Sequence, residues 1–367
     1  MNKVGITIIG AGVIGLAIAA ELSKQHKDIV LLEKESSFGQ HTSSRNSEVV
    51  HAGIYYPKDS LKAKLCVEGN KLLYDFCEKY SVPHARLGKL IVAMNDGEVV
   101  QLEELMERGM GNGVRGMRFL ESAEIEALEP SIKAKKALFS PSTGIIDSHI
   151  LMKKLEEQAQ EQDVLISYGS EVRGVRYEGG EYYINVNGEE ALKTGKLINS
   201  GGLFADKIAA IAGIDIQANK YQLHYCKGEY FSFSKPSFLK HLVYPVPEQD
   251  IKGLGIHAVL DLAGGLKFGP NAEYVNEIDY KVDPSHRASF YNAVKDLYPM
   301  VNESDLSPDQ AGVRPKLQGP GQGFRDFVIR EESGNGFPGL INLIGIESPG
   351  LTGCLAIGKL IAGWLKA

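Results

Sequence analysis

The chain has 367 residues, of which 43% are hydrophobic and 23% are charged, a composition typical of a globular protein with a large core. This length exceeds what one compact domain usually holds, so we expect two packed domains. The formal net charge of −6 disfavours a broad nucleic-acid surface, although a local site for a small anion stays compatible with it.

The apolar runs and the cysteines of the chain argue against further classes of protein. The run at residues 3–20 contains glycines that belong to a motif, so we interpret it as structure rather than as a signal peptide. The run at residues 355–365 is shorter than the roughly 20 apolar residues of a membrane span, which leaves only peripheral membrane contact open. The cysteines form no CxxC pair, which indicates neither a zinc site nor a redox dithiol but reduced thiols in a cytoplasmic protein.

The first forty residues predict a βαβ unit that binds a dinucleotide. Residues 5–9 are typical of a buried strand, a helix follows, and a second strand at residues 29–32 leads to Glu33. The turn between strand and helix is Gly10-Ala11-Gly12-Val13-Ile14-Gly15, in which the glycines permit a tight turn, close approach of a pyrophosphate and close helix packing. Glu33 is placed to accept hydrogen bonds from a ribose, which disfavours NADP.

The glycine turn alone does not show whether the bound dinucleotide is FAD or NAD. The segment that follows, FGQHTSSRNSEVVHAGIYY at residues 38–56, is dense in hydroxyl and amide groups that can bind a pyrophosphate, and Arg45 can offset its charge. A second glycine turn, Ser200-Gly201-Gly202, follows an apolar strand at residues 196–200. It again presents backbone amides where a phosphate can bind.

The rest of the chain alternates helical and strand patterns. A cap signal at Asp147-Ser148 starts one helix, and Asn187-Gly188 predicts a hairpin. The predicted helices cover residues 60–80, 98–108, 149–162, 285–297 and 353–365, with another starting near 205; the predicted strands cover residues 89–93, 165–177, 182–186, 221–225, 229–233, 241–247 and 342–346.

A series of motifs spread over nearly the whole chain resembles the FAD-dependent glycine oxidase and D-amino acid oxidase superfamily. Within it, the sequence is most similar to the L-2-hydroxyglutarate dehydrogenase/oxidase group, and the block at residues 45–56 is also similar to one in FAD-dependent glycerol-3-phosphate dehydrogenases. The sequence departs from the group at Glu48, where a small residue is usual, and after His257. The motifs are Gly10–Gly15 with Glu33, Ser44–Ser47 with His51–Tyr56, Asn199–Gly202, Lys227–Phe231, Gly312–Lys316 and Gly345–Thr352.

The resemblance implies an α/β fold: a Rossmann-like FAD-binding domain with an interleaved substrate domain, α+β in character, on a mixed or antiparallel sheet. We expect the FAD-binding domain to comprise residues 1–85, 145–220 and 312–367, and the substrate domain residues 86–144 and 221–311. Motifs and resemblance together predict FAD contacts from Gly10, Gly12, Val13, Ile14, Gly15, Glu33, Lys34, Thr42, Ser43, Ser44, Arg45, Asn46, Val172, Ser200, Gly201, Gly202, Arg314, Ser348, Pro349, Gly350, Leu351 and Thr352.

The chemistry that this resemblance implies is oxidation of a small 2-hydroxy acid, with L-2-hydroxyglutarate to 2-oxoglutarate the best single choice. Hydride passes to flavin N5, and a protein base takes the hydroxyl proton. His51 and His257 are the two candidate bases, and the sequence does not decide between them. Arg314, framed by glycine and proline, is the candidate cation for the substrate carboxylate.

Further substrate contacts are predicted from Tyr55 and Tyr244 as phenolic donors and from Lys316 as a second cation. Oxidation of an amine, as in glycine oxidase, is the alternative reaction on the same fold. A redox-inactive flavoprotein and an NAD-binding protein also stay open. The electron acceptor can be oxygen, a quinone or a protein, because no sequence feature selects one.

Overall fold

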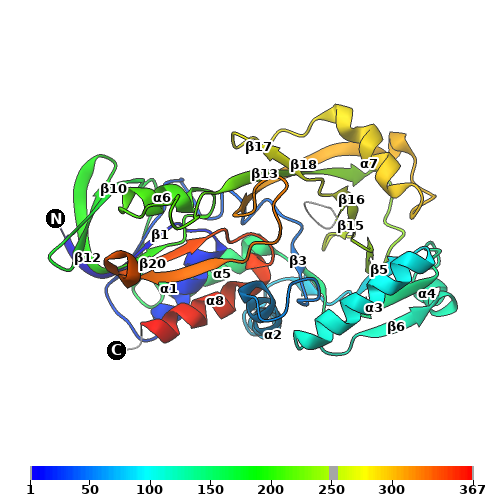
Figure 1. Cartoon of the computed structure of the whole chain (residues 1–367), viewed down its shortest axis with the longest axis horizontal. Helices are drawn as coiled ribbons and strands as arrows, with labels where there is room; N and C mark the ends of the chain where they lie inside the picture. Colours follow the sequence, from blue (N-terminus) through cyan, green and yellow to red (C-terminus); the bar gives the residue numbers. More distant parts are fainter. Residues whose placement is uncertain (1, 248–254, 366–367) are drawn as a thin grey trace. The chain divides into compact units, whose positions relative to one another are not determined.

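The structure is a computed structural model that describes residues 2–247 and 255–365. The chain forms two compact units, each assembled from segments far apart in the sequence. Unit 1 comprises residues 1–44, 148–225 and 314–367, and unit 2 comprises residues 45–147 and 226–313. Figure 1 shows the blue, green and red parts of the chain together in unit 1. The interleaving expected from the sequence is therefore present.

Unit 1 contains an eight-stranded sheet with a parallel centre, in the order β20-β12-β1-β2-β9. The antiparallel strands β10 and β11 extend it beside β12, and β19 pairs with β20. The strands are β1 (Asn2–Ile9), β2 (Ile29–Leu32), β9 (Leu165–Ser167), β10 (Val172–Glu178), β11 (Glu181–Val186), β12 (Glu189–Asn199), β19 (Val328–Glu332) and β20 (Phe337–Ile344).

The central strands of this sheet are apolar because helices cover them. β2 is buried at every position, and the helix α1 packs against α5 and α8. Gly358 of α8 allows this approach, since a Cβ there would lie 2.8 Å from the carbonyl oxygen of Ala17 in α1. The helices of unit 1 are α1 (Val13–Leu22), α5 (Ser148–Gln160), η1 (Gly202–Phe204), α6 (Ala205–Ile211), η4 (Ser333–Asn335) and α8 (Gly350–Trp364).

Unit 2 contains three smaller sheets, in the orders β15-β16-β13-β17 with β18 beside β13, β14-β5-β7-β6, and β3-β8-β4. Its strands are β3 (Val49–Val50), β4 (His84–Ala85), β5 (Lys89–Ala93), β6 (Arg118–Glu121), β7 (Lys136–Ser140), β8 (Gly144–Ile146), β13 (His224–Phe233), β14 (Leu242–Pro245), β15 (His257–Leu260), β16 (Leu266–Gly269), β17 (Glu273–Val275) and β18 (Leu306–Lys316). The start of β13, up to Tyr225, and the end of β18, from Arg314, belong to unit 1. Its helices are α2 (Leu61–Tyr80), α3 (Asp96–Gly111), α4 (Ser122–Leu128), η2 (Pro284–His286), α7 (Arg287–Val294) and η3 (Glu303–Asp305).

The division differs from the expected one for residues 45–85, which lie in unit 2. Both short strands of this segment, β3 and β4, pair with β8 of the same unit. The side chains of Asn70 and Tyr74 also donate hydrogen bonds to the carbonyl oxygen of Ser142, at 3.0 and 3.2 Å. These bonds tie the segment to residues 86–147 rather than to the dinucleotide turn.

Most predicted elements are present with shifted ends. The hairpin turn at Asn187-Gly188 joins β11 to β12, as predicted. The strand expected at residues 221–225 is present only from His224, where β13 begins, and residues 221–223 lie outside it. The backbone amide of Leu223 instead bonds the carboxylate of Asp206 at 3.1 Å, and the Tyr221 hydroxyl bonds that of Glu332 at 2.9 Å. Side chains, not a neighbouring strand, hold this segment.

None of the helices formed by residues 2–247 and 255–365 combines the length and the hydropathy that crossing a bilayer requires. Over the same ranges, the histidine, cysteine and acidic side chains form no cluster of three or more suited to a metal ion. The four cysteines, Cys66, Cys77, Cys226 and Cys354, are buried and belong to no disulfide.

Candidate active site

The first glycine turn of unit 1 has a backbone geometry that only glycine adopts readily. Gly10 has a φ of +101°, and its amide donates to the carbonyl oxygen of Leu32 at 2.8 Å. A Cβ on Gly10 would lie 2.7 Å from the carbonyl oxygen of Ser200. The turns that end β1 and β12 therefore lie side by side, at the carboxyl edge of the parallel sheet where ligands of such folds bind.

The other two glycines leave space for close approach. A Cβ on Gly15 would lie 1.9 Å from the Gly10 carbonyl oxygen. Any residue other than glycine at this position would therefore prevent α1 from lying so close to the turn. A Cβ on Gly12 would meet only the Ser43 hydroxyl, at 3.0 Å. That hydroxyl accepts a hydrogen bond from the Val13 amide at the start of α1, also at 3.0 Å. Ser43 thus stands at the helix N-terminus, where an anion binds favourably.

Glu33 lies at the end of β2, and its carboxylate organises the same turn. One oxygen accepts the Ala11 amide at 2.7 Å, and the other accepts the Glu35 amide at 2.9 Å. A carboxylate has about four acceptor positions, so these two bonds leave capacity for the hydroxyl groups of a ribose. Contact of Glu33 with a ribose stays a prediction.

The second glycine turn is fixed by its neighbours in unit 1. The Ser200 hydroxyl donates to the carbonyl oxygen of Ile9 at 2.8 Å, and the Gly201 amide donates to the side chain of Asn199 at 3.2 Å. Gly202 has a φ of +56° and open space where a Cβ would stand. This turn belongs to the same edge of the sheet as the first one.

The C-terminal motif in unit 1 begins a helix earlier than expected. We predicted a helix from Gly353, whereas α8 starts at Gly350, directly after Pro349. Amides of a first helical turn have no partner within the helix and bear positive partial charge. Ser348, Leu351 and Thr352 flank this helix start, where the sequence predicts flavin contacts.

The remaining predicted cofactor residues are divided between the two units. Lys34 lies beside Glu33, with its ammonium 3.5 Å from the centre of the Phe204 ring. Thr42, Ser44 and Val172 also lie in unit 1, whereas Arg45 and Asn46 lie in unit 2. Arg45 stacks on the Tyr280 ring at 4.1 Å. The residues of unit 1 fit a dinucleotide cofactor, because its turns provide the cradle, the helix N-terminus and the ribose acceptor.

In unit 2, the loop from His51 to Tyr56 is held by side chains that bond its carbonyl oxygens. Asn70 donates to the His51 carbonyl at 2.9 Å, and Asn112 donates to those of Gly53 and Tyr56, each at 2.9 Å. The φ of Gly53 is +99°, so the loop needs glycine there. The loop is therefore rigidly positioned, which suits side chains that act on a substrate.

The structure brings four predicted substrate-site residues of unit 2 into one cluster with Lys89. The rings of Tyr244 and His257 stack with centres 3.7 Å apart. Lys89 has its ammonium 4.6 Å from the ring centres of both Tyr55 and Tyr244. Burial lowers the pKa of His51 to about 3, assisted by the positive charges of Lys89 and His257. His51 is therefore a neutral imidazole that can accept a proton.

Sequence reasoning missed Lys89, which begins β5 and is 1% exposed. Burial lowers the pKa of its ammonium to about 7. The signal in the sequence was a charged residue at the head of an otherwise apolar strand, Lys89–Ala93. The sequence predicted no role for this residue, and the structure shows that it is buried.

The two predicted cations of β18, Arg314 and Lys316, belong to unit 1. Arg314 is half-buried. The Lys316 ammonium is buried and forms an ion pair with the two carboxylate oxygens of Glu347, at 3.2 and 3.3 Å. Glu347 belongs to the C-terminal motif, so the ion pair joins β18 to the segment that precedes α8.

Comparisons with known proteins agree with this geometry. The family model described as FAD dependent oxidoreductase (DAO) matches residues 5–364. The chain is 42% identical to the mitochondrial L-2-hydroxyglutarate dehydrogenase of Arabidopsis thaliana, over 98% of this chain and 83% of that protein. It is 31% identical to the L-2-hydroxyglutarate dehydrogenase of Indibacter alkaliphilus, over 98% of both chains.

Solved structures show the same fold. A dithionite-reduced L-α-glycerophosphate oxidase from Mycoplasma pneumoniae with FAD bound is 28% identical and has a TM-score of 0.88, covering 100% of this chain and 96% of that chain. A glycine oxidase from Geobacillus kaustophilus, 19% identical over 99% of this chain and 94% of that chain, has a TM-score of 0.80 and supports the fold alone. The predicted superfamily, α/β fold and FAD cofactor are confirmed, and the chain belongs to the DAO family of FAD-dependent oxidoreductases.

Proposed function

We propose that this chain oxidises L-2-hydroxyglutarate to 2-oxoglutarate. The observation that carries the proposal is the 42% identity, over 98% of this chain, with a protein named L-2-hydroxyglutarate dehydrogenase. The cluster in unit 2 supports it, since it combines a neutral histidine with phenol and ammonium groups in a buried environment. We assign cofactor binding to unit 1 and substrate binding chiefly to the cluster of unit 2.

The assignment gives the protein a small set of tasks. FAD, when bound, accepts the hydride that leaves the substrate carbon. His51 takes the hydroxyl proton, so that the carbon–oxygen bond becomes a carbonyl. Arg314 binds the carboxylate next to that carbon, because a guanidinium holds a carboxylate by two parallel hydrogen bonds. Lys316 stays a predicted contact, with its charge offset by Glu347.

Anaerobic mixing of the FAD-loaded protein with L-2-hydroxyglutarate tests the proposal. We expect the visible flavin band to bleach within a rapid single turnover and 2-oxoglutarate to form in a one-to-one ratio with reduced flavin. The D-enantiomer is the matched control and is expected to leave the band unchanged. Absence of bleaching with L-2-hydroxyglutarate, in protein that retains FAD, would reject the proposal.

Three matters stay predictions. The solved glycine oxidase has the same fold, so amino acids belong in the same bleaching assay as the alternative substrates. The electron acceptor, whether oxygen, a quinone or a protein, is to be found by reoxidation kinetics with each. We retain the cytoplasm as the predicted location and peripheral membrane contact as an open partner, whereas the Arabidopsis relative is named mitochondrial.

A further inference from the structure

Lys89 is buried in unit 2 without an opposite charge. It is 1% exposed, and its neighbours on β5 are fully buried. Among residues 2–247 and 255–365, no carboxylate lies within ion-pair distance of its ammonium. Burial of an unpaired ammonium is costly, and attraction to aromatic rings offsets only part of that cost. A lysine in this position therefore indicates an anion that none of the described residues provides.

The described groups that lie near Lys89 carry no negative charge near pH 7. Tyr55 and His51 lie on the loop after β3, Cys66 on α2, and Tyr244 on β14. Burial raises the pKa of the Tyr55 phenol and of the Cys66 thiol, and lowers that of His51. His257 on β15 acts on the cluster through His51 and Tyr244. None of these groups supplies a negative charge.

The same cluster contains two buried phenols without hydrogen-bond partners. The hydroxyl oxygens of Tyr55 and Tyr244 are both inaccessible to solvent, and neither makes a hydrogen bond within the described residues. The Tyr55 phenol also contributes, after burial, to raising the pKa of Tyr244, which indicates that the two phenols are close. Lys89, Tyr55 and Tyr244 therefore offer donors for which the described part of the chain provides no acceptor. The group that completes such a site accepts hydrogen bonds and bears negative charge, as a carboxylate does.

We propose that Lys89, with the Tyr55 and Tyr244 hydroxyls, binds the second carboxylate of a dicarboxylic 2-hydroxy acid and so determines the preference for dicarboxylates over monocarboxylates. The inference rests on the proposed function, which already requires one cation for the carboxylate next to the reacting carbon. Arg314 is assigned to that carboxylate. Lys89 is then a specificity-determining residue that takes no part in proton or hydride transfer.

Substrate pairs of equal carbon chain length test this inference. L-2-hydroxyglutarate and L-2-hydroxypentanoate differ only in that a methyl group replaces the second carboxylate. We expect Lys89→Met to raise the KM for L-2-hydroxyglutarate by about 10- to 100-fold, the range for loss of a hydrogen bond to a charged group. The ratio of kcat/KM for L-2-hydroxyglutarate to kcat/KM for L-2-hydroxypentanoate is expected to fall by a similar factor, since only the first substrate places a carboxylate at this site. An equal loss for both substrates, or no loss for either, would overturn the inference.

The wild-type protein provides a second test that does not depend on how a variant folds. The pKa of Lys89 near 7 means that the ammonium is charged below that pH and neutral above it. The KM for L-2-hydroxyglutarate should therefore rise by about tenfold per pH unit above about 7, with little change for L-2-hydroxypentanoate. Lys89→Arg keeps its charge and should remove the rise. A pH-independent ratio of the two KM values in the wild type would contradict the inference.

Binding of unreactive analogues separates this inference from the proposed function. Glutarate and pentanoate, which carry no hydroxyl, are titrated into the FAD-loaded protein, and the shift of the flavin spectrum is followed. We expect glutarate to bind at least about tenfold more tightly than pentanoate in the wild type and equally in Lys89→Met. If no hydroxy acid reduces the flavin, the proposed function is wrong, but the binding of glutarate and pentanoate still tests the role of Lys89. If the wild type binds the two acids equally, the role of Lys89 alone is rejected.

Discussion

The imidazole of His257 stacks on the phenol ring of Tyr244, with ring centres 3.7 Å apart and planes inclined by 27°. His257 Nδ1 lies 2.8 Å from the carbonyl oxygen of Gly255, which fixes a proton on that nitrogen in the neutral ring. The contacts hold His257 in place and make it a support for Tyr244. We propose His51 as the proton acceptor, so that the two candidate bases, between which the sequence does not decide, can be tested against each other.

We therefore expect His51→Gln to slow flavin reduction by L-2-hydroxyglutarate about 10²- to 10⁴-fold, the usual contribution of a general base. His257→Gln should slow it less than about tenfold and act mainly on substrate affinity through Tyr244. Anaerobic stopped-flow measurement of the reductive step separates the two effects. His84→Gln, a change in β4 of the same unit, is the control, and a larger loss in His257→Gln would reverse the assignment.

The pH dependence of the reductive step follows from the pKa of His51. A base acts when it is deprotonated, and a pKa of about 3 keeps this imidazole neutral at all pH values above about 4. The rate at saturating substrate should therefore show no acidic limb between about pH 5 and 7, where an ordinary histidine of pKa about 6.5 would give one. A limb near 6.5 that vanishes in His51→Gln would show that substrate binding restores an ordinary pKa.

Local motifs were the part of the site that the sequence could predict. The glycine turn, Glu33 and the hairpin at Asn187-Gly188 depend on backbone conformations and on spacings of a few residues, which sequence displays directly. The loop of His51 was also identified, although its rigidity comes from Asn70 and Asn112, each far along the chain. Such long-range hydrogen bonds leave no local pattern.

Tertiary neighbours decide the rest. Lys89 begins an apolar strand, and nothing near it in sequence reveals that Tyr55 and Tyr244 lie on either side. Ser44 and Arg45 belong to one polar segment of the sequence, yet the boundary between the two units lies between these two residues. Sequence gives the residue types of a site, whereas burial and charge, which set their chemistry, depend on segments that the fold brings together.

Close packing at Gly15 gives a stability prediction. A Cβ there would lie 1.9 Å from the Gly10 carbonyl oxygen and 2.7 Å from the Ser200 hydroxyl. Because both neighbours are parts of fixed turns, Gly15→Ala should destabilise the protein by about 3 kcal/mol or more and abolish FAD retention. Gly363→Ala in α8 is the matched control, since a Cβ there meets nothing within 4 Å. The control should gain up to about 1 kcal/mol in urea unfolding; equal stabilities for the two variants would refute the packing argument.

The carboxylate of Glu33 gives a prediction on cofactor affinity. Glu33→Gln keeps an acceptor for the Ala11 amide but loses the charge and half of the acceptor capacity. We expect the Kd for FAD to rise about 10- to 100-fold, as for loss of a charge-assisted hydrogen bond, and the FAD-free protein to lose about 1 kcal/mol of stability because the Glu35 amide loses its acceptor. Glu35→Gln changes the same charge two residues away and should leave the Kd within about threefold. Ultrafiltration with fluorescence of released flavin measures both, and similar Kd values would show that Glu33 does not contact the cofactor.

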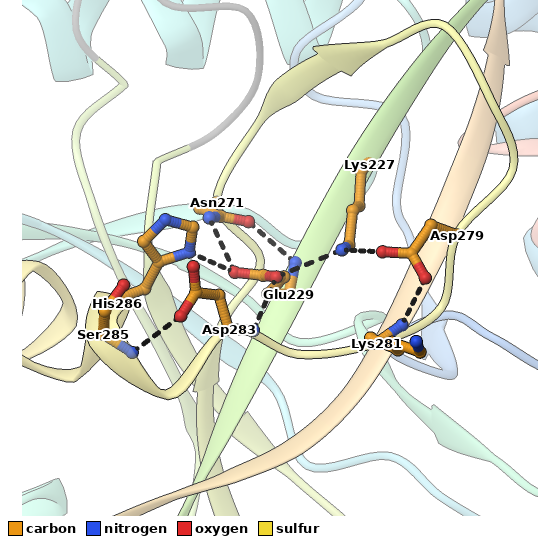
Figure 2. A network of polar contacts seen from close by, with 8 residues as sticks. All are labelled: Lys227, Glu229, Asn271, Asp279, Lys281, Asp283, Ser285 and His286. Carbon is orange, nitrogen blue, oxygen red and sulfur yellow. Dashed lines mark hydrogen bonds and ion pairs between the residues drawn. The ribbon is translucent and has the colours of Figure 1, made fainter.

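The last prediction concerns the polar network around Glu229, which Figure 2 shows between β13 and the segment from Asn271 to His286. Glu229 is 1% exposed; it accepts the Asp283 amide at 3.1 Å and lies 2.5 Å from His286 Nδ1. Burial alone would raise the pKa of its carboxyl, but hydrogen bonds from His286, Asp283 and Lys227 lower the pKa overall. The hydrogen bond to Glu229 raises the pKa of His286 above 6.5.

These shifts fix the sign of the pH effect. The lowered pKa of Glu229 stabilises the fold above about pH 4.5, and this contribution is lost as pH falls through the folded value. The raised pKa of His286 stabilises the fold fully below about 6.5, and that contribution is lost as pH rises through its folded value. The pair of Glu229 and His286 therefore contributes most to the stability of the fold between about pH 4.5 and 6.5.

A double-mutant cycle of Glu229→Gln and His286→Ala measures the pair. Since His286 is about a third exposed, we expect a coupling free energy of only about 1 kcal/mol near pH 5.5, decreasing towards the value of a neutral hydrogen bond by about pH 9. Glu229→Gln alone should lower the free energy of unfolding more than His286→Ala alone at either pH. The reason is that the glutamate also accepts the Asp283 amide and forms an ion pair with Lys227. Urea unfolding of the four proteins at both pH values gives these energies, and a coupling that is as large at pH 9 as at pH 5.5 would mean that the histidine charge contributes nothing.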